Sequence, residues 1–318
     1  MKTQDGRPKT QDENGGAHVE LRDASRWYGN VVAVNAITVA LEPGITGLLG
    51  PNGAGKSTVL HMIAGLLAPS AGLVLIDGQN AAGNPDIYRK LGLVPEREAV
   101  QPFLTGFEFV RMNAKLQRMA DPDGAARRAI ALVDLEGAAH RKVGGYSKGM
   151  RQRVKIAGAL VHEPSILLLD EPFNGMDPRQ RLHMMEMLHG MASGGCTVLI
   201  SSHILEELND LASSVLVMVA GRLAASGHFR EIRKLMTNRP HTFTLKSTDD
   251  RRLAAELIAE PSVQSVDLAQ GGLAIRTSDR GVFTRALPRR ARAAGISIHE
   301  LLPTDESLES VFNYLVKR

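Results

Sequence analysis

Short apolar runs alternate with helix-patterned segments along the first two thirds of the chain. Ile45–Leu49, Ser165–Leu169 and Thr197–Ile200 are rich in apolar residues. Runs of this length are typical of strands that a parallel sheet buries on both faces. Apolar side chains recur at helical spacing in Val59–Leu67 and again from Met150 onward. This alternation predicts an α/β fold.

Residues 92–165 carry mainly helical patterns, so we expect a helical subdomain there. Thr105 and Glu108 match a capping box, which predicts that a helix starts at this point. Asp121 followed by Pro122 predicts the start of another helix.

From about residue 239 the pattern changes to that of a small separate unit. In chain order it predicts a strand at His241–Leu245, a helix near Asp250–Ala259, strands around Val263–Asp267 and Leu273–Arg276, a helix near Gly281–Ala294, a strand at Ile296–Leu302 and a final helix from about Glu306. The βαββαβ order predicts a ferredoxin-like α+β domain over residues 239–318. Nothing in this part of the sequence marks a ligand site.

Composition places the chain among cytosolic globular proteins. Its 318 residues, of which 43% are hydrophobic, exceed one typical domain. No run approaches 18 consecutive apolar residues, and residues 1–17 are polar and Gly-rich, which predicts a disordered tail without a secretion signal. The single Cys196 excludes an internal disulfide and is expected to be an inert core thiol. The net charge of +4 comes from interspersed charges, so we expect no nucleic-acid partner.

A phosphate-binding loop is the strongest chemical signal in the sequence. Residues 50–58 read GPNGAGKST and lie between an apolar run and a helix-patterned segment. The glycines let backbone N–H groups turn toward an anion, and the following helix directs its positive N-terminus to the same place. Lys56 supplies a charge to the β- and γ-phosphates, and the Ser57 hydroxyl suits Mg²⁺.

Two carboxylates follow the second apolar run directly. Asp170 and Glu171 end the sequence SILLLDE, which predicts acids at the carboxyl edge of a buried parallel strand. Asp170 is placed to hold Mg²⁺ through water. Glu171 is placed to orient or deprotonate the water that attacks a γ-phosphate. Without a phosphate loop, both acids would be read as solvated charges at a strand end.

A second anion site is predicted about twenty residues before these acids. The sequence YSKGMRQR opens a helix, with Ser147 as its N-cap and Gly149 in the first turn. A hydroxyl and free backbone N–H groups at a helix start can bind an anion. Taken alone, such a motif is usually only a helix cap.

The order and spacing of these motifs resemble the ATP-binding subunit of an ABC transporter. The resemblance implies a P-loop NTPase domain with an ABC-type helical subdomain, which we expect over residues 18–238. It implies that Ser147 and Gly149 contact the ATP of a partner subunit, although the YSKGM sequence departs from the usual LSGGQ. It assigns ATP binding to Tyr28, Gly50, Pro51, Asn52, Gly53, Ala54, Gly55, Lys56, Ser57, Thr58, Glu96 and Asp170, with Mg²⁺ held by Ser57, Glu96 and Asp170.

Three further family positions have alternative structural explanations. Tyr28 matches the aromatic residue that stacks on adenine, but a lone Tyr is more often a packing residue, and Trp27 is the alternative stacking partner. Asn174 and Asp177 match a loop that crosses the dimer interface, yet NGMDP is also an ordinary turn before a Pro-started helix. His203 matches the histidine that contacts the γ-phosphate, and we expect it to be catalytic together with Glu171, although an isolated His after a strand is usually structural.

Glu96 stands where the family commonly has a glutamine that ligates Mg²⁺ and contacts the membrane partner. Glu96 and the YSKGM sequence resemble the type-two exporter branch, whose members move drugs, antibiotics, lipids or polysaccharides. The resemblance further makes Glu96 and the segment Phe103–Val110 candidates for contact with the membrane partner, although ordinary core packing also explains its phenylalanines Phe103, Phe107 and Phe109.

The expected function is that of an ATPase subunit that energises an exporter. Two copies, or one copy and a related ATPase subunit, would enclose two ATP molecules, and closure would drive a separate multi-spanning permease. The protein would lie on the cytoplasmic face of the cell membrane. Two alternatives remain open: a soluble ABC ATPase acting on nucleic acid, the ribosome or cofactor assembly, and a nucleotide-gated binding module without turnover.

Overall fold

A computed structural model describes residues 18–97, 100–228, 241–269 and 272–303. Its contacts divide the chain into two units, Met1–Ser226 and Gly227–Arg318, each with its own hydrophobic core. Three predictions lie outside the described residues: the tail at 1–17, the domain boundary at 238–239 and the helix from Glu306.

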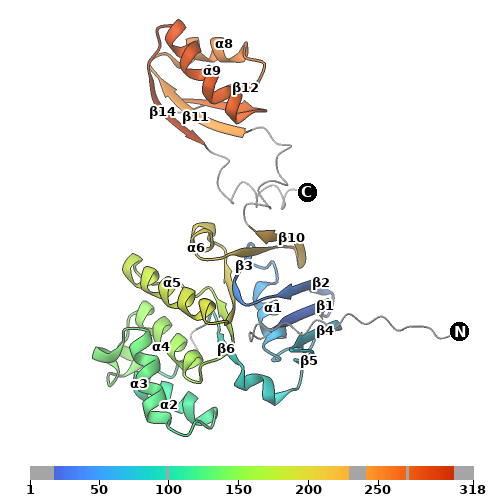
Figure 1. The fold of residues 1–318 in the computed structure, drawn as a ribbon, viewed down its shortest axis with the longest axis vertical. Coiled ribbons are helices and arrows are strands. Elements are labelled where there is room, and N and C mark those ends of the chain that lie inside the picture. Colours follow the sequence, from blue (N-terminus) through green and yellow to red (C-terminus); the bar gives the residue numbers. More distant parts are fainter. Residues whose placement is uncertain (1–17, 98–99, 229–240, 270–271, 304–318) are drawn as a thin grey trace, which may run out of the picture. The chain divides into compact units, whose positions relative to one another are not determined.

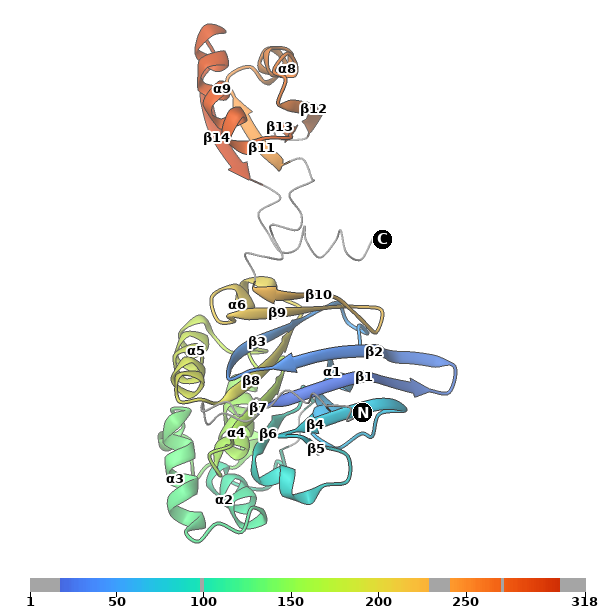
Figure 2. The same cartoon turned by 45° about the vertical axis from the view of Figure 1, so that its right-hand side comes forward.

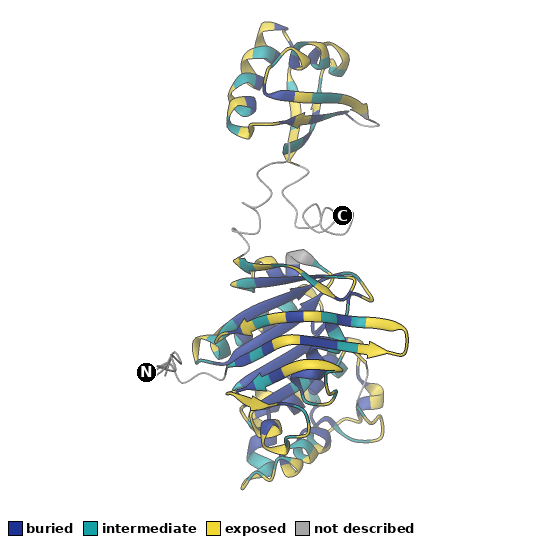
Figure 3. Cartoon of the chain, turned by 90° about the vertical axis from the view of Figure 1, so that its right-hand side faces the viewer, coloured by how far each residue is buried: buried dark blue, intermediate teal, exposed yellow. Residues whose placement is uncertain are grey.

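The larger unit contains a six-stranded sheet in the order β10-β9-β3-β8-β7-β6 (Figure 1). Its strands are β3 (Gly44–Leu49), β6 (Leu91–Val94), β7 (Ile166–Asp170), β8 (Thr197–Ser202), β9 (Ser214–Val219) and β10 (Arg222–His228). The pairings from β9 across to β6 are parallel. Figure 3 shows the central strands buried along most of their length, as their continuous apolar runs predict.

A second, antiparallel sheet has the order β2-β1-β4-β5. It consists of β1 (Val19–Tyr28), β2 (Val31–Leu41), β4 (Ala71–Ile76) and β5 (Gln79–Asn80). Helix α1 (Lys56–Ile63) lies between the two sheets (Figure 2), and its Leu60 and Met62 join side chains of both in one core. This core fixes the start of α1, and therefore the loop before it, against the six-stranded sheet.

The other face of the six-stranded sheet packs against α5 (Pro178–Ser193) and α6 (Leu205–Asn209). Gly47 in β3 permits this close approach, because a Cβ atom there would lie 3.0 Å from a side-chain methyl of Leu208. The two helices therefore pack on one face of the sheet whose strands β7 and β8 lead to the predicted catalytic residues.

The helical subdomain consists of α2 (Gly106–Leu116), α3 (Pro122–Leu132) and α4 (Lys148–Leu160), joined by short 3₁₀ turns at Glu136–Ala138 and Val143–Gly145. The predicted capping box at Thr105 is present, and the Asp121 side chain caps α3. One part of the prediction is wrong, because residues 92–94 belong to β6 and not to the helical subdomain. Strand β6 pairs with β7, and a four-residue run is too short for periodicity to distinguish strand from helix. A further 3₁₀ turn, Pro85–Arg89, precedes β6.

The smaller unit has the βαββαβ element order that the sequence predicts. Its elements are β11 (His241–Ser247), α8 (Asp250–Ile258), β12 (Val263–Ala269), β13 (Gly272–Thr277), α9 (Arg280–Ala293) and β14 (Ile298–Pro303). They form an antiparallel sheet in the order β12-β13-β11-β14. Both helices contribute to a core around Phe243 and Phe283, whose ring centroids lie 5.1 Å apart. Among the helices of the described residues, none has the length and apolarity needed to cross a membrane.

Candidate active site

The loop that connects β3 to α1 has the backbone conformation of an anion cradle. Gly55 precedes α1 with φ +99°, and a Cβ atom there would lie 2.4 Å from the carbonyl oxygen of Ala33, so only glycine fits. No side chain caps α1, and the first N–H groups of the helix therefore face the loop without a protein side-chain partner. A phosphate is the group that such a helix start binds well.

Lys56 is buried at the centre of this loop. Its Nζ donates hydrogen bonds to the carbonyl oxygens of Gly50 and Pro51, at 2.7 and 3.3 Å. It also lies 3.6 Å from Glu171 Oε1. The amine is therefore held inside the loop and not at the surface.

A cavity of about 300 Å³ opens beside Lys56 and brings most of the predicted ATP site together. It is lined by Ala33, Pro51, Asn52, Gly53, Gly55, Lys56, Ser57, Thr58, Glu96, Asp170 and Glu171. Two of these residues are carboxylates from other parallel strands, since Glu96 follows β6 and Asp170 ends β7. The strand order places both strand ends at the phosphate loop.

Glu171 has an unusual backbone conformation and two polar neighbours. It follows β7 in a left-handed conformation, φ +49°, which is costly for a residue other than glycine. Its N–H group donates to Ser201, and its Oε2 lies 2.9 Å from His203 Nδ1. Its Oε1 is buried without a hydrogen-bond partner, although Lys56 is near. Because Glu171 lines the cavity, this oxygen is the one left to accept a proton or a hydrogen bond.

Burial raises the pKa of Glu171 above its ordinary value of 4.5. The hydrogen bond and charge of His203, and the charge of Lys56, act in the opposite direction, while Asp170 adds a further increase. A carboxyl with a raised pKa is a stronger base once ionised, which suits a group that activates water near neutral pH.

We expect the turnover number to fall on the acidic side at a pH above that of an ordinary glutamate. Hydrolysis needs ionised Glu171, and its raised pKa moves the loss of activity to higher pH. His203→Ala removes groups that lower this pKa, so the acid limb is expected to move to still higher pH. A pH profile of the turnover number for both proteins tests this, and an acid limb that stays in place or moves to lower pH in His203→Ala contradicts it.

Sequence reasoning missed two residues that hold the site. Ser201 of β8 donates a hydrogen bond to Asp170 Oδ1 and accepts one from the Glu171 N–H group. Lys155 of α4 is buried, and its Nζ donates to the carbonyl oxygens of Pro95, Glu96 and Arg97. Ser201 lies 31 positions after Asp170 and 30 after Glu171, so no local pattern reveals its contacts.

The remaining predicted residues do not line the cavity. Ser147 caps α4 by accepting a hydrogen bond from the Met150 N–H group at 3.2 Å. Asp177 caps α5 in the same way through the Gln180 N–H group. The two helix starts lie together, because a Cβ atom on Gly149 would be 2.8 Å from the carbonyl oxygen of Gly175. A second group of residues therefore surrounds this contact. It consists of Ser147, Gly149, Asn174 and Asp177.

Tyr28 also lies apart from the cavity lining. It ends β1 with 48% of its surface exposed, and the Arg26 guanidinium lies 5.0 Å from its ring centroid. Trp27 is 46% exposed. Both rings are accessible to a planar ligand, so the choice between them stays a prediction. Cys196 is buried, and burial raises the pKa of its thiol to about 11, which agrees with an inert core residue.

Comparison with known proteins identifies the family. The model of the ABC transporter family matches residues 34–174. The chain is 32% identical to the bacitracin transport ATP-binding protein BcrA of Enterococcus faecalis, over 94% of this chain and 96% of that protein. It is also 32% identical to the daunorubicin/doxorubicin resistance ATP-binding protein DrrA of Streptomyces peucetius, over 92% and 91% of the two chains.

Solved structures agree with these relatives. An ATP-binding subunit of an ABC transporter, 30% identical, superposes with a TM-score of 0.63 over 68% of this chain and 92% of that one. A dimeric ATP-binding cassette in a post-hydrolysis state with ADP and Pi, 26% identical, gives 0.62 over 67% and 99%. The chain belongs to the family of ABC transporter ATP-binding subunits.

Proposed function

We propose that this ATPase subunit energises an exporter by closing with a second copy, or with a related subunit, around two ATP molecules. The observation that carries the proposal is the Glu171 carboxylate, held between Lys56 and His203 at the phosphate cavity. Export is supported by the relatives named for bacitracin transport and daunorubicin resistance. The subunit then works at the cytoplasmic face of the cell membrane, beside a multi-spanning permease.

The roles of the site residues follow from their positions. Lys56 and the N–H groups of the loop bind the β- and γ-phosphates. Glu171 orients and deprotonates the attacking water, whose oxygen forms the new bond to phosphorus as the bond to the ADP oxygen breaks. His203 holds the Glu171 carboxylate in place through Nδ1 and leaves its other ring nitrogen for the γ-phosphate.

Ser57, Glu96 and Asp170 are suited to hold Mg²⁺. A hydroxyl and two carboxylates are hard oxygen donors, and all three residues line the phosphate cavity. No cluster of three His, Cys, Asp or Glu side chains fit for a metal occurs in the described part of the chain. When bound, Mg²⁺ supplies charge neutralisation at the phosphate oxygens.

The group formed by Ser147, Gly149, Asn174 and Asp177 supports a composite site. Its two helix starts offer N–H groups and a hydroxyl but do not line the cavity of their own chain. They are therefore free to contact the ATP held by a second subunit. The dimeric state of the related cassette solved with ADP and Pi supports the pairing of two subunits.

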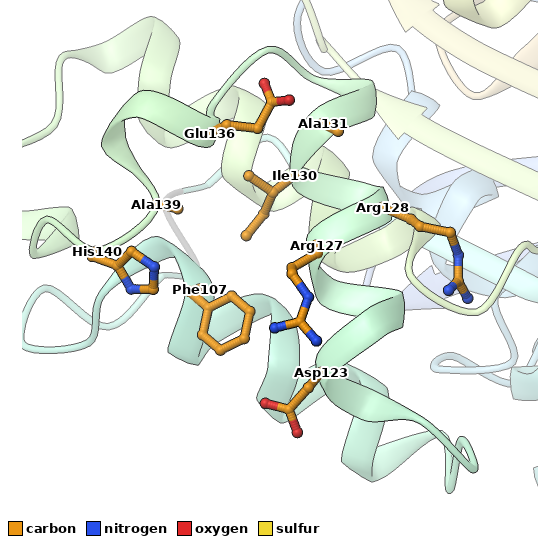
Figure 4. Close-up of a pocket in the computed structure, with 9 residues that line it drawn as sticks. All are labelled: Phe107, Asp123, Arg127, Arg128, Ile130, Ala131, Glu136, Ala139 and His140. Atoms are coloured by element: carbon orange, nitrogen blue, oxygen red, sulfur yellow. The ribbon is translucent and has the colours of Figure 1, made fainter.

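A larger cavity in the helical subdomain is the proposed seat of the membrane partner (Figure 4). It measures about 600 Å³ and has an apolar floor of Phe107, Ile130, Ala131 and Ala139. Asp123 at its edge is paired with Arg111 at 2.9 Å. Arg127, in contrast, forms no hydrogen bond or ion pair within the described ranges of the chain. Glu136 also lines the cavity, so the cavity fits a cytoplasmic segment of the permease with an apolar side chain and with a carboxylate placed at Arg127.

Arg127→Glu is expected to reduce the amount of permease recovered with this subunit at least about tenfold, since like charges across an interface cost several kcal/mol. Co-purification from membranes, quantified against this subunit, measures the effect. Arg89→Glu is the matched control, because Arg89 is exposed and does not line the cavity. Equal recovery with Arg127→Glu and with the unchanged protein would remove this cavity from the docking surface.

The proposed function is tested by a pull-down of tagged Glu171→Gln protein from detergent-solubilised native membranes with Mg-ATP. The expected result is a stoichiometric protein with several membrane spans. Recovery of only soluble proteins or nucleic acid would instead favour a soluble ATPase of the same family.

A further inference from the structure

Glu207 is a buried carboxylate close to the active site that has no role in the chemistry described above. It lies in the short helix α6, four residues after His203, and its side chain is 4% exposed. Its two oxygens have different partners. Oε2 accepts a hydrogen bond from Ser202 Oγ at 2.9 Å, and Oε1 pairs with the Arg181 guanidinium at 3.0 Å. Burying a carboxylate costs free energy that its partners must offset, so the position of Glu207 requires an explanation.

The contact to Ser202 acts on the backbone that carries His203. Ser202 Oγ donates to Glu207 and accepts a hydrogen bond from the Ile204 N–H group at 3.0 Å. The residues on both sides of His203 are therefore joined at the Ser202 hydroxyl, which in turn is held by the Glu207 carboxylate. Helix α6 has only five residues, and the side chain of its N-cap residue, Ile204, forms no capping hydrogen bond. Local helix structure alone does not fix this segment, so the Glu207 contact matters for its position.

The contact to Arg181 leads back to the catalytic carboxylate. Arg181 belongs to α5, and its guanidinium carbon lies 6.0 Å from the ring centroid of Phe173. Phe173 is 1% exposed and follows Glu171 by two residues. Glu207 thus connects the segment of His203 with the segment of Glu171 through side chains packed behind the site.

His203 depends on this support, because its own ring is weakly held. The side chain is 44% exposed, and within the described residues its ring forms a hydrogen bond to Glu171 Oε2 alone. A shift of its backbone would therefore move the imidazole away from the carboxylate without resistance from other ring contacts.

We propose that Glu207 is a positioning residue for ATP hydrolysis: it holds the His203 segment and helix α5 in the arrangement in which the imidazole reaches Glu171. The inference rests on the proposed roles of Glu171 and His203. It predicts that Glu207 affects the chemical step only through His203.

A double-mutant cycle tests this dependence. Single-turnover rates and ATP affinities are measured for the unchanged protein, Glu207→Ala, His203→Ala and the double variant, with Glu186→Ala as a control. Glu186 is an exposed carboxylate on α5 that takes no part in the contacts of Glu207 described above. We expect His203→Ala to lower the rate about 100-fold or more and Glu207→Ala about tenfold, with ATP affinity within about threefold. The double variant is expected to match His203→Ala within about twofold.

A double variant that loses the product of the two single effects would overturn the proposal, because Glu207 would then act independently of His203. So would an unchanged rate in Glu207→Ala. An unchanged rate in His203→Ala would overturn the role proposed for His203 itself, and this inference with it. The two failures are therefore distinguishable.

Glu207→Gln replaces Glu207→Ala in the test if the alanine variant has a melting temperature below the assay temperature. Its amide oxygen still accepts from Ser202, while its pairing with Arg181 is lost. We expect its rate to lie between those of the unchanged protein and Glu207→Ala, and its effect to disappear in the His203→Ala background. An additive effect there contradicts the proposal in the same way.

Discussion

Glu171→Gln is expected to lower the turnover number for ATP by about 10²–10⁴ while ATP still binds. Glutamine keeps the size of the side chain and its contact to His203, but its amide cannot accept a proton from water. The buried Oε1, which now has no hydrogen-bond partner, is the atom whose basicity is lost. Steady-state phosphate release measures the rate, and a fluorescent ATP analogue measures binding.

The control for this experiment is Glu186→Gln, which removes a carboxylate from an exposed face of α5. It should keep its turnover number within about twofold of the unchanged protein, as is usual for surface substitutions. A Glu171→Gln protein with more than about a tenth of the normal rate would show that another group activates the water.

Lys56→Ala is expected to weaken ATP binding about 10- to 100-fold. A hydrogen bond to a charged group contributes about 1.5–3 kcal/mol, and every 1.4 kcal/mol changes affinity tenfold. The buried amine donates to the carbonyl oxygens of Gly50 and Pro51. Among the carboxylates that line the phosphate cavity, Glu171 is the one that pairs with it. Its removal also takes away a charge that lowers the pKa of Glu171, so the remaining activity should fall at a higher pH.

Calorimetry with ATP and with adenosine separates this effect from general unfolding. The loss should appear for ATP and not for adenosine, because Lys56 is expected to contact phosphates alone. Lys115→Ala, at an exposed position of α2, is the matched control. Unchanged ATP affinity in Lys56→Ala would contradict the assignment of the phosphate loop.

Local patterns predicted much of the fold because their physics is local. The Thr105 capping box and the Ser147 cap are present, and all described elements of the smaller unit lie within two residues of their predicted ends. Strand β6 was not predicted because a short run such as Leu91–Val94 owes its conformation to pairing with β7. The phosphate loop and the two acids meet as predicted, since parallel strands end at one edge of the sheet.

The contacts that hold the site could not be read from sequence. Ser201 and Asp170 are 31 positions apart, and the register of β7 against β8 places them side by side. Glu207 and Arg181 meet only because α5 and α6 pack on the same face of the sheet. Serine and glutamate at such positions have no distinctive spacing, so a serine looks like a turn residue and a glutamate like a surface charge.

Native mass spectrometry of the Glu171→Gln protein with Mg-ATP tests whether two chains enclose two ATP molecules. We expect a dimer that carries two ATP molecules and dissociates when nucleotide is removed. Ser147→Asp in the same background should stay monomeric with ATP bound, because aspartate still caps α4 but repels the phosphate of the facing subunit. A dimer that Ser147→Asp leaves intact would contradict the composite site, and a Glu171→Gln protein that stays monomeric at saturating Mg-ATP would contradict closure between two copies of this chain.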